Sequence, residues 1–428
     1  MQAQLRARDG GLSLGSSELL CAASPLSGAA ACLPYLRDHA AQLCLDARRL
    51  GADSTLPYFD GLRAAVLRLR QQSTDVDLTL ASLLSGPPRS ASLHALSEGV
   101  FARRLSEVRL LQPDDRHRAR LRSAGGLHGG TWLAVFPMTM WTTARARHYQ
   151  LALALRLGHP LPELLGARGE APLCGAPGCG AAHDAFGFHP GTCRTGNRYG
   201  LWTLRHDAFQ LMLVHVIRLL GSAAQSCSVA SGNWFGSAGY LADSDSYRRA
   251  DVVCPHYFGP GRHLFLDTAV TDPGTGAALS ARPSSAASSG VAAEQRAAKK
   301  VAKYGPLAAA VSSQFRAAVI ERFGAVCDHL VGFISMLTGP GERDPLRWDD
   351  YCFSSSSRST YAASLCVFSV VIADACLVDR VIESDVCCAH AGRYVAPRRA
   401  RGAAASVPVQ QRDIEGIGGQ FWYEAARP

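Results

Sequence analysis

The sequence predicts a protein that combines helices with a β-sheet, in the α+β or α/β class. Apolar residues recur three or four positions apart within residues 31–165, for example from Leu62 to Leu69, and this period indicates helices. Residues 249–270 contain two short apolar runs separated by Gly259-Pro260-Gly261, which predicts a β-hairpin. At 428 residues and 47% hydrophobic content, the chain is long enough for two or three domains with cores of their own.

The chain divides into six predicted segments. Residues 1–30 are rich in Gly, Ser and Ala and are expected to be flexible. The mostly helical residues 31–165 are interpreted either as an accessory domain that contacts RNA or DNA or as a packing scaffold. The apolar run from Leu365 to Ala373 is shorter than the roughly 20 residues that cross a bilayer, which favours a buried helix. The remaining segments are a cysteine-rich knuckle at 166–200, a core with the hairpin at 201–340, a helical segment at 341–390 and a flexible basic tail at 391–428.

Two aspartates lie in the predicted hairpin, one on each strand. Asp251 belongs to the run Arg249-Ala250-Asp251-Val252-Val253, and Asp267 belongs to Leu266-Asp267-Thr268-Ala269-Val270. If the turn is centred on Gly259-Pro260-Gly261, Asp267 faces Val253, and Asp251 is its diagonal neighbour at roughly 7–8 Å on the same face. Such carboxylates can share one or two magnesium ions. The alternative is an ordinary hairpin with surface aspartates near its turn.

A lysine-bearing helix is predicted downstream of the hairpin. Residues 293–304 are dense in strong helix formers, and Lys300 and Lys303 share one helical face. A lysine beside a metal-bound phosphate can neutralise the charge that develops on it during hydrolysis. The alternative is a solvated basic helix.

Three cysteines and one histidine, all of which can bind a metal ion, lie close together in the sequence. Cys174, Cys179, His189 and Cys193 are separated by four, nine and three residues, and the loops between them are rich in Gly and Pro. Three thiolates and one imidazole make a closed tetrahedral zinc site of the knuckle type. His183 competes for the histidine position, and cysteines scattered without a metal are the alternative.

The triplet Arg205-His206-Asp207 opens an apolar helical segment that runs through Leu220. One interpretation is N-terminal capping with a local salt bridge. The other is that Arg205 and His206 face nucleic-acid phosphates or the metal site.

Taken in order, the knuckle, Arg-His-Asp, Arg-x-Asp, Leu-Asp-x-x-Val and the Lys-x-x-Lys-Tyr helix resemble the C-terminal end of non-LTR retrotransposon polyproteins. The likeness is to their restriction-like endonuclease and covers roughly residues 115–335. It implies a PD-(D/E)XK-like nuclease core, a mixed sheet with flanking helices, that nicks target DNA to prime reverse transcription. No Tyr/Phe-x-Asp-Asp reverse transcriptase signature occurs in the sequence.

The resemblance also implies roles for individual residues. The first and second acids of the family map onto Asp251 and Asp267, which would hold magnesium or manganese. The displaced catalytic lysine maps onto Lys300, with Lys303 or Lys299 as substitutes. The knuckle would hold a structural zinc, and the residues directed towards nucleic acid would be Arg205, His206, Asp207 and Arg249.

The sequence departs from the family pattern at three places. Ala250 replaces the proline that usually precedes the first acid, and no lysine lies two residues after Asp267. The helix from Arg205 to Gly221 lacks the extra glutamate that often completes the metal shell. Catalysis would therefore depend on a lysine supplied by the separate helix.

The overall charge agrees with a nucleic-acid partner. A formal net charge of +9 attracts phosphates without regard to base sequence. Fourteen cysteines without regular spacing outside the knuckle indicate reduced thiols and hence the nucleus or the cytoplasm. The expected partner is DNA, with RNA as a second candidate and no membrane. Two functions stay open: a metal-dependent DNA endonuclease, and a catalytically inactive, retroelement-derived protein that binds zinc and nucleic acid.

Overall fold

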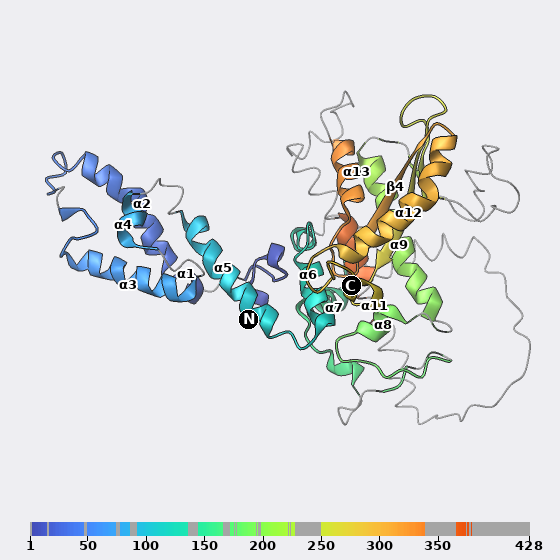
Figure 1. Ribbon diagram of the computed structural model, residues 1–428, viewed down its shortest axis with the longest axis horizontal. Helices are drawn as coiled ribbons and strands as arrows, with labels where there is room; N and C mark the ends of the chain where they lie inside the picture. The colour runs from blue at the N-terminus through green and yellow to red at the C-terminus, as the bar shows by residue number, and fades with distance from the viewer. Residues whose placement is uncertain are drawn as a thin grey trace, which may run out of the picture. The chain divides into compact units, whose positions relative to one another are not determined.

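The chain forms two compact units, Met1–Pro113 and Asp114–Pro428. The structure is a computed structural model (Figure 1). The residues it describes are 2–14, 17–46, 49–73, 78–85, 92–135, 144–165, 172–174, 176, 178–193, 195, 198–220, 222, 224–226, 250–338, 365–373, 375 and 378. The predicted helical region 31–165 is mostly helical in its described part, but the break at Pro113 divides it between the two units.

The first unit is a small helical bundle. Its helices are α1 (Ser17–Leu20), α2 (Ala23–Asp38), α3 (Pro57–Gln72), α4 (Leu80–Ser85) and α5 (Leu93–Leu110). The apolar stripe of α3, from Phe59 to Leu69, packs with α2, α4 and α5 in one buried cluster. The predicted period of three to four residues therefore marks a true core face.

The expectation of flexibility for residues 1–30 does not match the structure. This segment contains the short 3-10 helices η1 (Gln2–Gln4) and η2 (Ala7–Asp9), α1 and the start of α2. Leu5 is fully buried, and Ala29 and Ala30 lie in the bundle core. Small residues here allow close helix packing, so their abundance did not signal a loose chain.

The second unit is built around a four-stranded mixed sheet in the order β1-β2-β3-β4. The first two pairings are antiparallel, and β3 pairs with β4 in parallel. The long helix α12 (Val291–Ala310) connects these two parallel strands as the crossover that such a pairing requires. The strands are β1 (Gln225–Ser226), β2 (Val252–Cys254), β3 (Leu264–Thr271) and β4 (Gln314–Glu321).

Helices cover both faces of this sheet. On one face, Tyr304 and Ala308 of α12 (Val291–Ala310) pack against Val253 and Phe265. On the other, α9 (Arg198–Leu219) contributes buried side chains such as Phe209, Met212 and Leu213. Figure 1 shows α12 and α9 on opposite sides of the strands. The further described elements are α6 (Asp115–Ala124), η4 (Thr131–Ala134), α7 (Ala146–Leu157), η5 (Pro162–Leu164), α8 (Phe188–Thr192), α11 (Gly276–Leu279) and α13 (Asp328–Thr338).

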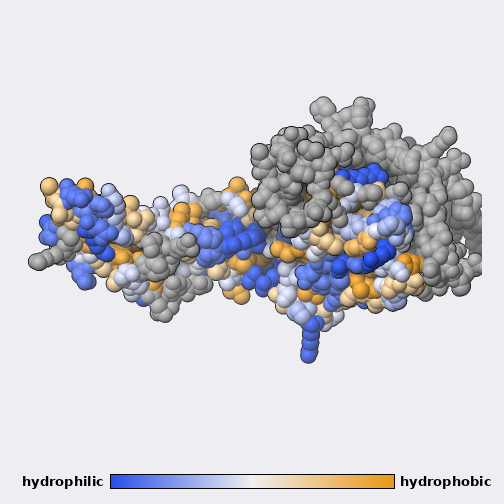
Figure 2. All heavy atoms as spheres, turned by 90° about the horizontal axis from the view of Figure 1, so that it is seen from above, coloured by the Kyte–Doolittle hydropathy of each residue, from blue (hydrophilic) through white to orange (hydrophobic). Residues whose placement is uncertain are grey.

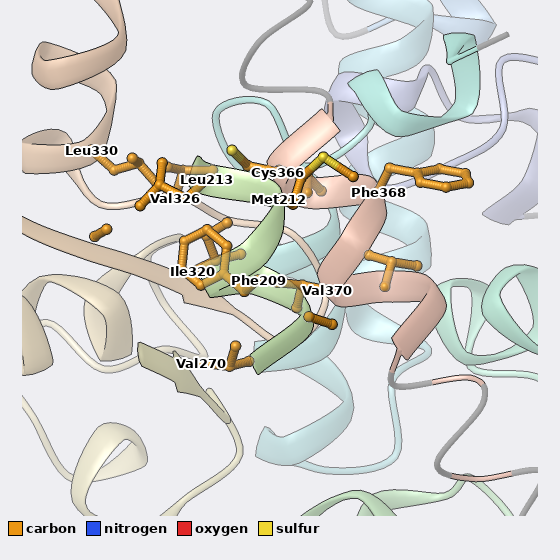
Figure 3. Packing of buried hydrophobic residues seen from close by; sticks show 14 of the residues in the cluster. Phe209, Met212, Leu213, Val270, Ile320, Val326, Leu330, Cys366, Phe368 and Val370 are labelled. Atoms are coloured by element: carbon orange, nitrogen blue, oxygen red, sulfur yellow. The ribbon is translucent and has the colours of Figure 1, made fainter. Parts of the chain in front are cut away.

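The apolar segment near the C-terminus is part of this core. Residues 365–373 are helical and buried. Cys366, Phe368 and Val370 lie in the same cluster as Phe209 and Met212 of α9 (Figure 3). The prediction of a buried helix is confirmed for these residues, whereas residues 391–428 lie outside the described residues.

None of the described helices is both long and apolar enough to span a membrane. Hydrophilic and hydrophobic side chains are interspersed on the described surface visible in Figure 2.

The hairpin is present, but its register differs from the predicted one. Val252 pairs with Leu266 and Cys254 pairs with Leu264. Continuing this register by one residue puts Asp251 directly opposite Asp267 rather than diagonal to it. The turn is centred on Gly259, whose φ is 111° and whose N–H donates to the carbonyl of His256. The chain therefore turns back one residue earlier than a turn centred on Pro260 would allow.

Candidate active site and metal centre

Two carboxylates and one lysine from three different parts of the chain meet where α12 packs on the sheet. Asp251 directly precedes β2, Asp267 lies in the middle of β3, and Lys300 lies on α12. The Lys300 Nζ is 2.5 Å from the Asp267 Oδ2, and both side chains are largely buried, with exposures of 11% and 7%. The crossover from β3 to β4 is what brings α12 back over the strand that carries Asp267.

Asp251 is held in one orientation by several donors. Its Oδ2 accepts hydrogen bonds from the backbone N–H of Thr268 at 2.7 Å and from the Thr268 hydroxyl at 2.8 Å. The Nε2 of His206 lies 3.2 Å from the same oxygen. The backbone carbonyl of Asp251 accepts from the Gln210 side chain at 2.6 Å. These contacts fix the carboxylate before any ligand binds, as a preorganised site requires.

The two carboxylates have opposite pKa shifts. Burial, and next the negative charge of Asp251, raises the pKa of Asp267 to about 7. Burial would also raise the pKa of Asp251, but hydrogen bonds from His206 and Asp267, with the charges of His206 and Lys300, hold it well below its usual range. Asp251 is therefore ionised at neutral pH, while Asp267 takes up a proton more readily than an exposed carboxylate. A divalent cation can replace that proton, because it stabilises both charges at once.

His206 belongs to this site. Burial alone would lower its pKa, but hydrogen bonds to Asp207 and Asp251 raise it to about 9, so the imidazole is a cation at neutral pH. Its Nε2 also lies 3.0 Å from the Thr268 hydroxyl. The capping interpretation of the Arg-His-Asp triplet is wrong, because α9 begins at Arg198, more than one turn earlier.

Of the other residues expected to face nucleic acid, the structure describes Arg205 and Asp207. Arg205 is only 1% exposed, and its guanidinium donates to the carbonyl of Gly191 at 3.3 Å, so it is a buried packing residue. Asp207 is partly exposed and pairs with His206 at 3.1 Å. Arg249 lies outside the described residues.

Only one of the three candidate lysines reaches the carboxylates. Lys303 is exposed, and its Nζ donates to the Tyr304 hydroxyl at 3.0 Å, while Lys299 is exposed on the outer side of α12. Lys299, Lys300 and Lys303 are also the only lysines among the 44 lysines and arginines of the sequence. Arginine serves elsewhere, and lysine is confined to the helix where a compact point charge is useful. This distribution was a sequence signal for the site that spacing alone did not reveal.

The predicted knuckle residues form a compact cluster. The candidate ligand atoms of Cys174, Cys179, His189 and Cys193 all lie within 4.8 Å of one another. The Cys174 and Cys193 sulfurs are 3.8 Å apart, and the Cys179 sulfur is 3.5 Å from the Nε2 of His189. Tetrahedral zinc with Zn–S bonds of about 2.3 Å requires sulfurs about 3.8 Å apart. This set of donors can hold a metal such as zinc, and His183 is outside the cluster.

Polar contacts that spacing did not predict hold the knuckle in place. The Asp184 carboxylate accepts backbone hydrogen bonds from Phe188 at 2.9 Å and His189 at 2.6 Å, which fixes the start of α8. Arg322, just beyond β4, donates to the carbonyl of Gly187 at 2.8 Å and pairs with Asp272 at 3.5 Å. A buried arginine thus joins the metal-ligand segment to the end of the sheet.

Glu321, the last residue of β4, is buried beside the first residues of α12. It is 1% exposed, and its Oε1 accepts from the backbone N–H groups of Ala292 at 2.9 Å and Ala293 at 3.3 Å. Burial raises its pKa to about 7 despite these hydrogen bonds. Glu321 therefore caps the first turn of the helix that positions Lys300.

The raised pKa of Glu321 predicts a pH-dependent stability. The folded protein binds this proton more tightly than the unfolded chain, so the stabilisation is complete below about pH 4.5 and is lost as the pH rises through about 7. We expect E321Q to reduce the fall in the free energy of unfolding between pH 5 and 7.5 by roughly 1–3 kcal/mol. Urea unfolding at several pH values measures this fall in the free energy of unfolding for the wild type and the variant. Asp267 titrates in both proteins, so an identical pH slope in the variant would contradict the assignment.

No protein-family model matches this chain, and no curated protein matches it. The chemistry of the site therefore has to be inferred from the residues and their geometry.

Proposed function

We propose that the chain is a retroelement-derived, metal-dependent endonuclease that nicks DNA by hydrolysis of a phosphodiester bond. The observation that carries this proposal is the convergence of Asp251 at the start of β2, Asp267 on β3 and Lys300 on α12. Two acids and a lysine at one site are the groups that phosphodiester hydrolysis needs. The order of these motifs after the cysteine-rich segment supports the same function.

The two carboxylates suit a hard divalent cation. Asp251 and Asp267 supply oxygen donors from opposite positions of one hairpin, and the raised pKa of Asp267 marks a place where positive charge is favoured. Magnesium or manganese held there would polarise a phosphate oxygen and activate a bound water. His206 and Thr268 hold Asp251 in place for this role.

Lys300 would act on the substrate phosphate. Its ammonium group lies at the Asp267 carboxylate within a largely buried site, where a charge acts more strongly than in water. As the phosphate accumulates negative charge during attack, this ammonium would stabilise it.

The Cys174, Cys179, His189 and Cys193 cluster would bind a structural zinc. All four protein positions of a tetrahedral site are filled by these side chains, which is typical of a closed structural site. Arg322 ties this segment to the nuclease core.

A nicking assay tests the proposal. Purified protein with magnesium or manganese is expected to convert supercoiled plasmid to the open circular form, and protein without added divalent cation is expected to leave it intact. D251N should abolish nicking while changing DNA affinity less than about threefold, because Asp251 serves the cation rather than the DNA backbone. A wild-type protein that binds DNA and zinc but never cuts would instead establish the inactive nucleic-acid-binding function.

A further inference from the structure

The outer face of α12 carries three cations and no acid. Arg296, Lys299 and Lys303 are exposed and lie at positions i, i+3 and i+7, so they form one line along the helix. We call these three residues the α12 basic face. The one acid of the helix, Glu294, is half-buried, and its carboxylate accepts from the backbone N–H of Asp328 at 2.5 Å. The other exposed positions of the helix are Ala298, Ala302, Pro306, Ala309 and Ala310.

These cations differ from several other surface cations of the protein. Arg63 pairs with Asp60 at 2.6 Å, Arg118 with Asp115 at 2.6 Å and Arg103 with Glu107 at 3.3 Å. Among the described residues, no acid pairs with the α12 basic face, and the neutral Tyr304 hydroxyl is the partner of Lys303. Their positive charge is therefore not neutralised by a neighbouring carboxylate, and it remains to attract an anion from solution.

The spacing of these charges fits a nucleic-acid strand. Arg296 and Lys303 are seven residues apart, which is about 10.5 Å along an α-helix. One strand of duplex DNA presents a phosphate about every 3.4 Å along the duplex axis, so about three phosphates span that length. The small alanines beside the cations let a backbone approach closely. They offer neither the large apolar side chains of a protein interface nor those of a membrane-binding helix.

We propose that the α12 basic face binds the phosphate backbone of duplex DNA, while Lys300 on the same helix points inward to the carboxylates. This inference rests on the proposed function for the identity of the partner. One helix would then place the substrate strand and supply the charge that acts on its phosphate. Arg296 and Lys303 lie four residues before and three residues after Lys300, so they are its neighbours on the helix surface, and the bound backbone lies beside the site.

The distribution of lysine gives a direct test on the wild-type protein. An amine-reactive ester can label only Lys299, Lys300, Lys303 and the N-terminal amine. Mass spectrometry would follow the acylation rate of each amine in the presence and in the absence of duplex DNA. Neither sample would contain added magnesium or manganese. We expect bound DNA to slow acylation of Lys299 and Lys303 about fivefold or more, leaving the N-terminal amine unchanged. Unchanged rates on DNA-bound protein, or protection by an RNA duplex but not by DNA, would overturn the proposal.

A charge-matched pair of variants supplies the second measurement. R296Q/K299Q/K303Q removes the α12 basic face, and R63Q/R103Q/R118Q removes three arginines that already pair with acids. We expect the first variant to reduce the magnitude of the negative slope of log affinity against log salt concentration by about 2.7. The second variant should keep a slope near the wild-type value. Equal slopes for both would overturn the proposal.

The binding experiments and the nicking assay can fail separately. Protection of Lys299 and Lys303 without nicking would retain this surface and remove the nuclease function. Nicking without protection of these lysines would retain the nuclease function and remove the DNA-binding role of the α12 basic face.

Discussion

D267N is expected to lower magnesium-dependent nicking by about a thousandfold or more. Asp267 contacts both Asp251 and Lys300, so its replacement removes a cation ligand and the partner that holds the lysine. Asparagine has nearly the same shape but carries no charge. The rate of plasmid nicking at saturating DNA measures the effect, and D115N, at an exposed surface position, serves as the matched control.

The free energy of unfolding of D267N distinguishes a loss of catalysis from a loss of the folded structure. Burial and the charge of Asp251 raise the pKa of Asp267 to about 7, which means that its ionised form is held at a cost to folding. Above pH 7 the neutral asparagine is therefore expected to leave the free energy of unfolding unchanged or increased. A variant that nicks like the wild type would exclude Asp267 from the catalytic site.

C193S is expected to remove the bound metal and to destabilise the second unit strongly. Cys193 is buried, and its sulfur lies 3.8 Å from Cys174 and 3.7 Å from Cys179. Serine is a poor zinc ligand, and the site would be left with three donors. Wild-type protein should contain one zinc per chain by elemental analysis, and the variant should contain little. Its thermal midpoint should fall by about 10 °C or more, because metal binding contributes directly to folding.

The control for this prediction is C21S, at an exposed cysteine of the first unit. It should alter neither the zinc content nor the thermal midpoint. A wild-type protein without bound zinc, or a C193S variant with unchanged zinc content, would contradict the assignment of the cluster.

Local spacing was sufficient to predict some features but not others. The ligand set Cys174, Cys179, His189 and Cys193 was identifiable because all four residues lie in one short loop-rich segment. The hairpin was identifiable from its glycines and apolar runs. Its register was wrong because the position of a nine-residue turn depends on backbone angles such as that of Gly259, which the glycine spacing leaves open.

Contacts between distant segments account for the remaining differences. The sequence neighbours of Arg205 are compatible with a phosphate-binding role, whereas the structure buries its side chain against Gly191. Thr268 and Glu321 were missed because their partners, Asp251 and the start of α12, are far away in the chain. The choice of Lys300 over Lys303 likewise required the packing of α12 on β3.

The measurement that tests the central claim most directly compares K300Q with R118Q. Both variants replace a cation with neutral glutamine: Lys300 is directed to Asp267, whereas Arg118 lies on the surface and pairs with Asp115. At saturating plasmid and with magnesium, K300Q is expected to lose nicking by about a hundredfold or more, while R118Q retains the wild-type maximal rate. A K300Q variant that nicks at the wild-type rate, or an R118Q variant that loses as much as K300Q, would contradict a catalytic centre formed by Asp251, Asp267 and Lys300.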